Sequence, residues 1–256
     1  MGKTNILKKI VILVLILALP GFLYYLLTAK GKNRYEPLSY FGPKQLAKTS
    51  HIVKGKSIPD TIYHSVPDFI LHDQYGQPVL SATFKDRIFI VNFFYTHCPT
   101  NCSQVSQNIS TLAGGYAGNK MVYFVSITVD PQRDTTGALK AYADKYNSVY
   151  KMADAKGDTT ANVRDVKTRF NISNHWLFLT GDTSTIYPLA RNGFLVNALK
   201  ESNGGFIYSD KVIMIDSHKH IRGYYSGTSP DDMTRLDNEI RVQISEELRN
   251  SSKALY

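Results

Sequence analysis

Two nearly continuous apolar runs constrain the fold of this chain more than any other feature. RIFIVNFFY spans residues 87–95 and KMVYFVSITVD spans residues 120–130, and neither alternates regularly between apolar and polar residues. Runs of this kind are typical of strands that are buried on both faces of a sheet. DTTGALKAYADKYN, at residues 134–147, has the apolar spacing of a helix that Asp134 or Thr135 would cap. Strands that alternate with helices predict an α/β layered domain.

The rest of the C-terminal part fits the same layout. Further expected elements are a hairpin at 54–79 with the turn DQYGQ, a strand at 175–181, a strand pair at 211–227 with the turn DSHKH, and a closing helix at 229–250. Ser229 is the expected cap of that helix and Pro230 its first residue. Residues 148–173 are expected to be a polar insertion.

The N-terminus carries an uncharged apolar run from Ile10 to Leu27. As a helix with a rise of about 1.5 Å per residue, this run covers roughly 27 Å, close to the roughly 30 Å hydrocarbon core of a bilayer. A cleaved signal peptide is the alternative, but the run is long for one and no clean small-x-small cleavage site follows it. We therefore expect an anchor in residues 1–29, with a transmembrane helix at about 10–27. Residues 30–64, polar and proline-containing, are expected to tether a domain at 65–256.

The formal net charge of +9 does not indicate a nucleic-acid partner. Its basic residues are scattered among acidic ones, and no basic run with interleaved aromatic residues is present. We expect a mildly basic, solvated surface and neither nucleic acid nor a nucleotide cofactor.

Cys98 and Cys102 are the only cysteines of the chain. A helix is expected from Cys98 to Leu112, with Pro99 in its first turn. The helix N-terminus would favour a thiolate, and a Cα separation of about 6 Å across one turn would permit a disulfide. Two neighbouring thiolates also suit one soft ion such as Cu(I). The spacing leaves redox and metal chemistry open and favours both over two inert buried thiols.

Four segments, VNFFYTHCPTNCSQ, SITVDPQRDT, WLFLTGD and IYSDKVIMIDSHKHIRGYYSGT, together resemble the Sco/SenC family over roughly residues 65–245. The resemblance implies a thioredoxin-like fold, with a central mixed sheet flanked by helices, preceded by one N-terminal transmembrane helix. It implies a role in metallating the dinuclear copper site of cytochrome c oxidase. It also implies that Cys98 and Cys102 bind copper and form a redox-active disulfide.

One position departs from the family pattern. The family carries its third copper ligand, a histidine, just before the strand that corresponds to KVIMID, and this chain has Tyr208 there. Neutral tyrosine is a poor ligand for Cu(I), which prefers sulfur and imidazole. His97 is a weak candidate for the missing nitrogen. His218 and His220 are expected to be exposed turn residues at the far end of the strand, around 17 Å away.

Asp130, Arg133 and Asp134 follow the second buried strand, at the sheet edge where α/β folds place their sites. The resemblance implies an accessory role for them in partner or metal handling. A turn with an Arg–Asp pair and a helix cap is the structural alternative.

Three functions remain open. The first is a copper-handling assembly factor for cytochrome c oxidase, and the second is a membrane-anchored thiol–disulfide oxidoreductase with little copper affinity. The third is a non-catalytic interaction module, and a peroxidase is a minor fourth. The expected partner is a cytochrome c oxidase subunit or another cysteine-bearing periplasmic protein. The expected location is the bacterial cell membrane, with a single span and the domain on the extracytoplasmic side.

Overall fold

The computed structural model describes residues 3–29, 37–53, 55–99, 101–147, 175–200 and 206–253. The chain divides into two compact units, Met1–Glu36 and Pro37–Tyr256. The expected insertion at 148–173 lies outside the described residues.

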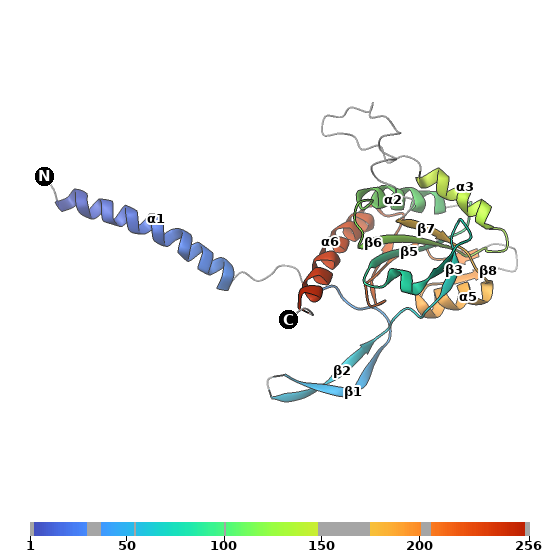
Figure 1. The fold of residues 1–256 in the computed structure, drawn as a ribbon, viewed down its shortest axis with the longest axis horizontal. Coiled ribbons are helices and arrows are strands. Elements are labelled where there is room, and N and C mark those ends of the chain that lie inside the picture. The colour runs from blue at the N-terminus through green and yellow to red at the C-terminus, as the bar shows by residue number, and fades with distance from the viewer. Residues whose placement is uncertain are drawn as a thin grey trace, which may run out of the picture. The chain divides into compact units, whose positions relative to one another are not determined.

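The N-terminal unit is one helix, α1 (Lys3–Ala29), which includes Pro20 (Figure 1). Large apolar side chains are exposed along it, among them Ile16 and Leu17 at 65% and 71%. Among the helices in the described part of the chain, none combines the length and the hydropathy that crossing a membrane requires. The expected helix over residues 10–27 is present, and its transmembrane character is not confirmed.

A five-stranded mixed sheet forms the centre of the second unit. Its strands are β5 (Ile88–Phe94), β6 (Val122–Thr128), β7 (Trp176–Leu179), β10 (Lys211–Ile215) and β11 (Ile221–Ser226), in the order β11-β10-β5-β6-β7. Strands β5, β6 and β7 are parallel, whereas β10 is antiparallel to both β5 and β11. Every residue of β5 is buried, as its continuous apolar run predicts. The expected central mixed sheet is confirmed.

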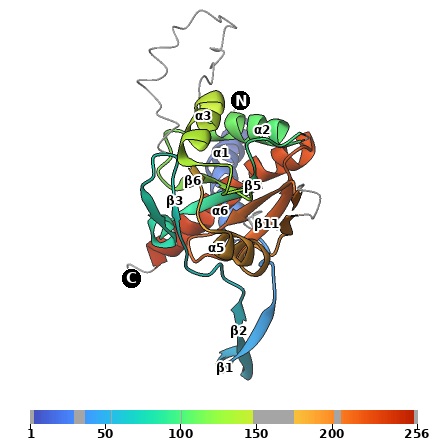
Figure 2. The ribbon, with the colours of Figure 1, turned by 90° about the vertical axis from the view of Figure 1, so that its right-hand side faces the viewer.

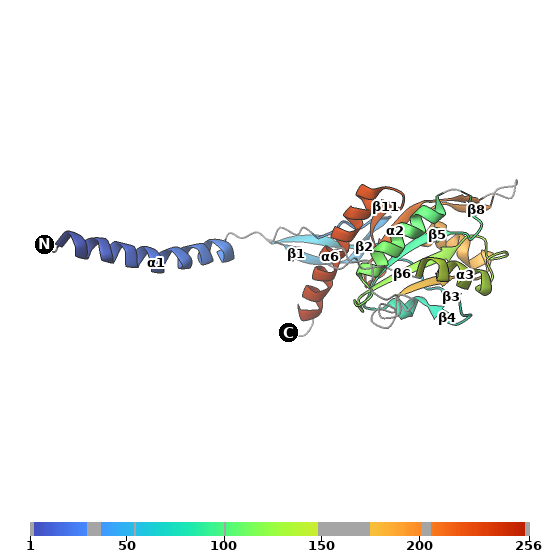
Figure 3. The ribbon, with the colours of Figure 1, turned by 90° about the horizontal axis from the view of Figure 1, so that it is seen from above.

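Helices cover both faces of this sheet. They are α2 (Cys102–Gly115), α3 (Thr136–Asn147) and α6 (Pro230–Lys253) on one face, and α5 (Thr183–Pro188) with the π-helical turn Leu189–Gly193 on the other (Figures 2 and 3). Successive side chains of β5 show the two layers. Phe94 packs on Tyr142 of α3, with ring centroids 4.9 Å apart, and Phe93 packs on Phe194 across the sheet at 5.6 Å. Because successive side chains of a strand point to opposite faces of the sheet, β5 contributes to an apolar layer on each face.

The expected tether at 30–64 contains regular structure. Strand β1 (Lys44–Val53) pairs antiparallel with β2 (Lys56–Tyr63) in a two-stranded hairpin (Figure 1). Gly55, between the strands, has a φ of +78°, which a side chain rarely adopts. β-branched residues in both strands favour this pairing, and the role of residues 30–64 as a tether stays a prediction.

Two further hairpins flank the sheet. In the first, strand β3 (Ile70–His72) pairs with β4 (Pro78–Leu80), and the short 3-10 helix η1 (Ser81–Phe84) follows. In the second, β8 (Ala198–Lys200) pairs with β9 (Phe206–Tyr208). The DQYGQ turn is confirmed, because Asp73 Oδ1 accepts the backbone N–H groups of Tyr75 and Gln77, each at 2.8 Å. Its expected first arm is shorter, since residues 56–63 pair with β1 instead.

Candidate redox and metal site

The site begins where β5 ends. Cys98 and Cys102 form a disulfide, with their Cα atoms 5.9 Å apart, close to the predicted separation. The predicted helix start at Cys98 is wrong, because α2 begins at Cys102 and Cys98 lies in the preceding loop. That loop turns back on the strand, with the Cys98 N–H donating to the carbonyl of Tyr95 at 3.2 Å.

The two cysteines differ in their surroundings. Cys102 is 3% exposed and Cys98 is partly exposed. As the first residue of α2, Cys102 lies where free backbone N–H groups and the helix dipole favour negative charge. Cys98 therefore offers its sulfur to a partner more readily, while the helix favours a thiolate at Cys102.

Asp134 holds the cysteine loop in place. Its carboxylate is fully buried and accepts the Thr96 backbone N–H at 3.0 Å and the Thr96 hydroxyl at 2.5 Å. It also accepts the hydroxyl of Thr128, at the end of β6. The cap of α3 falls instead to Thr135, whose Oγ1 accepts the Ala138 N–H at 3.4 Å. Asp134 thus joins the cysteine loop to the end of a neighbouring central strand.

Asp130 and Arg133 form an ion pair, as expected if these residues serve to build a turn. The Arg133 Nε donates to the carboxylate of Asp130, which is 2% exposed. Beside them the Tyr187 hydroxyl donates to the Val129 carbonyl at 3.1 Å. Burial, and to a smaller extent the charge of Asp130, raise the pKa of Tyr187. These contacts order the turn after β6, next to the cysteine loop.

Position 208, where the family resemblance implies a histidine, lies in β9, three residues before the start of β10. Tyr208 ends β9, where its backbone pairs with Ala198, and its side chain lies outside the described residues. Val212, near the start of β10, lies opposite Asn92, near the end of β5. His97 is exposed beside Cys98, with its Nδ1 2.9 Å from the Thr96 hydroxyl.

A contact that the sequence analysis missed clamps the end of β11 to α2. The Asn108 side-chain amide donates to the carbonyl of Gly227 at 2.8 Å, and Gln104 donates to that of Thr228 at 3.4 Å. A Cβ on Gly227 would lie 2.7 Å from Val105 Cγ1, so the close approach requires glycine. In the sequence, only the glycine at the end of the expected strand, Gly227, could have indicated this close approach.

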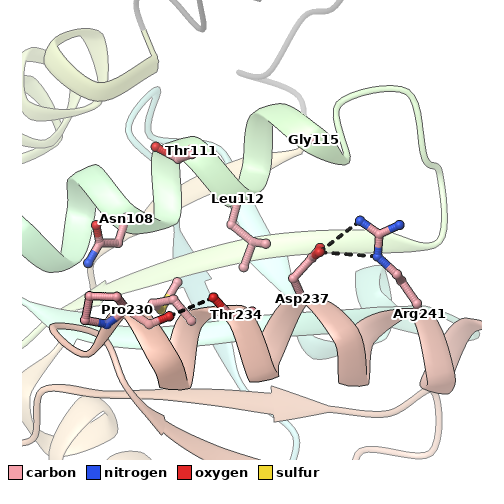
Figure 4. Close-up of a pocket in the computed structure, with 9 residues that line it drawn as sticks. Asn108, Thr111, Leu112, Gly115, Pro230, Thr234, Asp237 and Arg241 are labelled. Carbon is pink, nitrogen blue, oxygen red and sulfur yellow. Dashed lines mark hydrogen bonds and ion pairs between the residues drawn. The ribbon is translucent and has the colours of Figure 1, made fainter.

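Elsewhere along α2, a groove of about 430 Å³ separates this helix from α6 (Figure 4). Leu112 points into it from α2, and an ion pair between Asp237 and Arg241, 2.9 Å apart, lies at one end. The groove contains neither cysteine.

Comparison with known proteins agrees with this architecture. Residues 60–175 match the SCO1/SenC family model. An SCO1 protein homolog of Bacillus subtilis is 29% identical over 93 residues, which cover 36% of this chain and 48% of that protein. The chain thus spans about half the length of that relative. An SCO2-like protein of Rickettsia conorii is 24% identical over 240 residues, covering 93% of this chain and 98% of that one.

Solved structures share the fold. BsSco, described as having a disulfide switch and as a member of the Sco family of cytochrome c oxidase assembly proteins, has a TM-score of 0.53 and 22% identity, covering 70% of this chain and 92% of that one. Arabidopsis thaliana ScoI with copper bound has a TM-score of 0.52 and 20% identity, covering 72% and 98%. The α/β fold with its mixed sheet is thus the thioredoxin-like fold of these proteins. Taken together with the cysteine motif, the matched segment and these relatives support membership of the Sco/SenC family.

Proposed function

We propose that this chain handles copper during assembly of cytochrome c oxidase, with Cys98 and Cys102 as the residues that bind copper and form a disulfide. The observation that carries the proposal is the Cys98–Cys102 pair at the end of a central strand, in a chain of the Sco/SenC family. The copper-bound state of Arabidopsis thaliana ScoI and the assembly role stated for the family of BsSco support it.

The donor set fits copper only in the reduced state. A disulfide has no thiolate to offer, so loading requires prior reduction of the pair by two electrons. Two thiolates one helical turn apart then suit Cu(I), a soft ion that prefers sulfur ligands. Tyr208 at the family's histidine position leaves that ion without its usual imidazole, which favours weak and exchangeable binding.

A direct test compares the two redox states of the full-length chain. We expect the reduced chain to bind one Cu(I) in competition with a Cu(I) chelator, and the disulfide form to bind none. Cys98→Ser and Cys102→Ser should each abolish binding. Equal binding by the oxidised and reduced chains would place copper elsewhere and reject the proposal.

Thiol–disulfide exchange is the second candidate, favoured by the disulfide itself and by Tyr208. A thiolate at Cys98 attacks a partner's disulfide, forms a mixed disulfide and releases one partner thiolate. Cys102 then attacks the Cys98 sulfur, which restores the Cys98–Cys102 disulfide and releases the second partner thiolate. Two electrons pass to the partner, and two protons from the pair end on the partner's thiols.

The unequal exposure of the cysteines makes this candidate testable. Since Cys98 is partly exposed and Cys102 is buried, Cys102→Ser should trap a mixed disulfide with a disulfide-bonded peptide. Cys98→Ser is the matched control and should trap little. Equal trapping by both variants, in non-reducing electrophoresis, would contradict the assignment of Cys98 as the attacking residue.

We also propose that α1 anchors the protein in the bacterial cell membrane, with the second unit on the extracytoplasmic side and a cysteine-bearing partner there. The uncharged run from Ile10 to Leu27 supports this, as do the exposed apolar side chains along the helix. The protein should stay with the membrane pellet after alkaline carbonate extraction, and deletion of residues 1–29 should release it. Full extraction of the intact chain would reject the anchor.

A further inference from the structure

A second cluster of potential ligands lies at the opposite end of the sheet from the cysteines. Asp216 follows β10, His218 lies in the turn before β11, and Glu247 projects from α6. One potential ligand atom from each of the three lies within 4.8 Å of the others. Sequence reasoning assigned His218 to an exposed turn and had no signal for Glu247, which is distant in the chain.

Both carboxylates are buried and oriented by several donors. Asp216, 2% exposed, accepts the backbone N–H groups of His218 at 2.9 Å and His220 at 2.8 Å, and Arg222 Nη1 at 3.1 Å. Glu247, 7% exposed, accepts the Ser217 N–H at 3.3 Å, the Ser217 hydroxyl at 2.6 Å and the Gln243 amide at 2.9 Å. A carboxylate has about four acceptor positions, so these contacts leave about one free on each. The donors act as the outer partners that usually fix metal-binding carboxylates.

The charges of the cluster do not balance. Arg222, 2% exposed, is shared between Asp216 and Glu246, the latter at 3.0 Å. Nearby Lys219 is paired with Asp68 at 2.7 Å. Asp216 and the neighbouring Glu246 therefore share one guanidinium, and Glu247 has no ion pair among the described residues. Buried charge is costly unless it is paired, and a divalent cation would neutralise the surplus.

An independent observation comes from Gln243. This residue is 1% exposed and its amide nitrogen contacts Glu247, yet its Oε1 has no hydrogen-bond partner among the described residues. His220 Nδ1 also has no hydrogen bond there and lies 3.4 Å from Asp216. Because buried polar atoms are rarely left unpaired, a further polar species is expected beside Glu247.

We propose that Asp216, His218 and Glu247 form a second metal site, which binds a divalent transition-metal ion of the zinc class. One imidazole nitrogen and two carboxylate oxygens suit Zn²⁺ at about 2.0–2.2 Å, whereas Cu(I) prefers the sulfurs at the other end of the sheet. Ligand atoms around one such ion lie at most about 4.4 Å apart, twice the longest of these bond lengths, which is close to the 4.8 Å limit within which the three ligand atoms lie. His218 is exposed on a turn, and its Nδ1 lies 3.0 Å from the hydroxyl of Ser217, which also donates to Glu247.

The test uses the full-length chain with Cys98→Ser and Cys102→Ser, which removes the sulfur ligands. We expect one Zn²⁺ per chain by elemental mass spectrometry after dialysis. We also expect His218→Ala to lower the Zn²⁺ affinity at least tenfold in chelator competition. Zn²⁺ should raise the unfolding temperature of the parent and not of His218→Ala. His218 is exposed, so its loss should leave the fold intact.

His51→Ala is the matched control and should bind like the parent. His51 is also exposed and lies 2.6 Å from one carboxylate, that of Asp60. Among the described residues, it does not belong to a group of three potential metal ligands. Absence of bound Zn²⁺, parental affinity in His218→Ala, or an equal loss in His51→Ala would each overturn the proposal. A loss confined to His220→Ala would also overturn it, because the ligand would then be the wrong histidine.

Discussion

At the residue scale, the proposed copper binding depends on the donor at position 208. Cu(I) prefers sulfur and imidazole, and Cu(II) prefers nitrogen or oxygen in a tetragonal arrangement. Tyr208 ends β9, three residues before β10 enters the sheet at the cysteine end. An imidazole at this position would complete the ligand set that the family resemblance implies.

Tyr208→His should therefore raise the affinity of the reduced chain for copper, by about tenfold or more for Cu(II) and less for Cu(I). Chelator competition measures both ions. Tyr208→Phe is the matched control and should give no gain, and thiol exchange should remain nearly unchanged in both variants. If the parent already binds Cu(II) as tightly as Tyr208→His, another residue completes the site, and His97 is the first suspect.

Asp134 is a second decisive residue. Asp134→Asn replaces an acceptor of three hydrogen bonds with an amide whose nitrogen cannot accept them. The free energy of unfolding should fall by about 1–3 kcal/mol, because buried groups lose their partner. Thr128→Val removes only one of the donors and should cost about 1 kcal/mol. Urea unfolding of the oxidised chains measures both, and an Asp134→Asn loss no greater than that of Thr128→Val would contradict this role.

At the scale of elements, the start of α6 is stabilised by a capping hydroxyl, that of Ser229, and by the charged carboxylate of Asp232. The Ser229 hydroxyl accepts the Asp232 N–H at 3.3 Å, and Pro230 is the first helical residue, as expected. Asp232 in turn accepts the Ser226 N–H of β11 at 2.7 Å. That backbone hydrogen bond, and then Arg235, lower the pKa of Asp232. The helix dipole adds to the preference for a negative charge there.

Asp232→Asn should lower the free energy of unfolding by about 0.5–1 kcal/mol at pH 7, because the amide keeps an acceptor but loses the charge. Since the folded pKa lies below the unfolded value of about 3.9, the contribution is complete above that pH and is lost as pH falls through the folded pKa. Denaturant unfolding at neutral and acid pH measures the difference. Asp231→Asn, in the same helical turn, is the control and should cost less. A difference that persists at the lowest pH would contradict the assignment.

At the scale of the whole molecule, the two ends of one sheet carry different donor sets. The cysteine pair follows the end of β5, and the Asp216–His218–Glu247 cluster lies beyond the end of β10, which runs antiparallel to β5. Helices cover both faces of the sheet between them. The β1–β2 hairpin, whose backbone is drawn in Figure 1, has exposed apolar side chains, among them Ile52.

Substitutions in the buried core should lower the free energy of unfolding far more than substitutions in the exposed β1–β2 hairpin. Ile90→Ala, in the fully buried centre of β5, should cost about 2–5 kcal/mol, because a cavity opens in the core. Ile52→Ala is the matched substitution in the hairpin, where Ile52 is 78% exposed, and should change the free energy of unfolding by at most about 0.5 kcal/mol. Urea unfolding compares the two. A large loss in Ile52→Ala would indicate that the hairpin is covered in solution.

Local physics made much of this protein predictable from its sequence. Continuous apolar runs identified β5 and β6, the capping residues located the start of α6, and helical spacing anticipated the 5.9 Å Cα separation of the cysteines. These features depend on periodicity and backbone sterics within a few residues, so the sequence alone determined them.

Only the tertiary structure decided where distant segments meet. The cysteine loop leaves β5 without becoming helix because Thr96 binds Asp134, 38 residues away. Residues 56–63 pair with β1 although a hairpin with later residues was expected. Glu247 reaches Ser217 across 30 residues, which brings Asp216, His218 and Glu247 together. Such contacts form between segments whose sequences carry no mark of one another, because packing of the whole core determines which of them become neighbours.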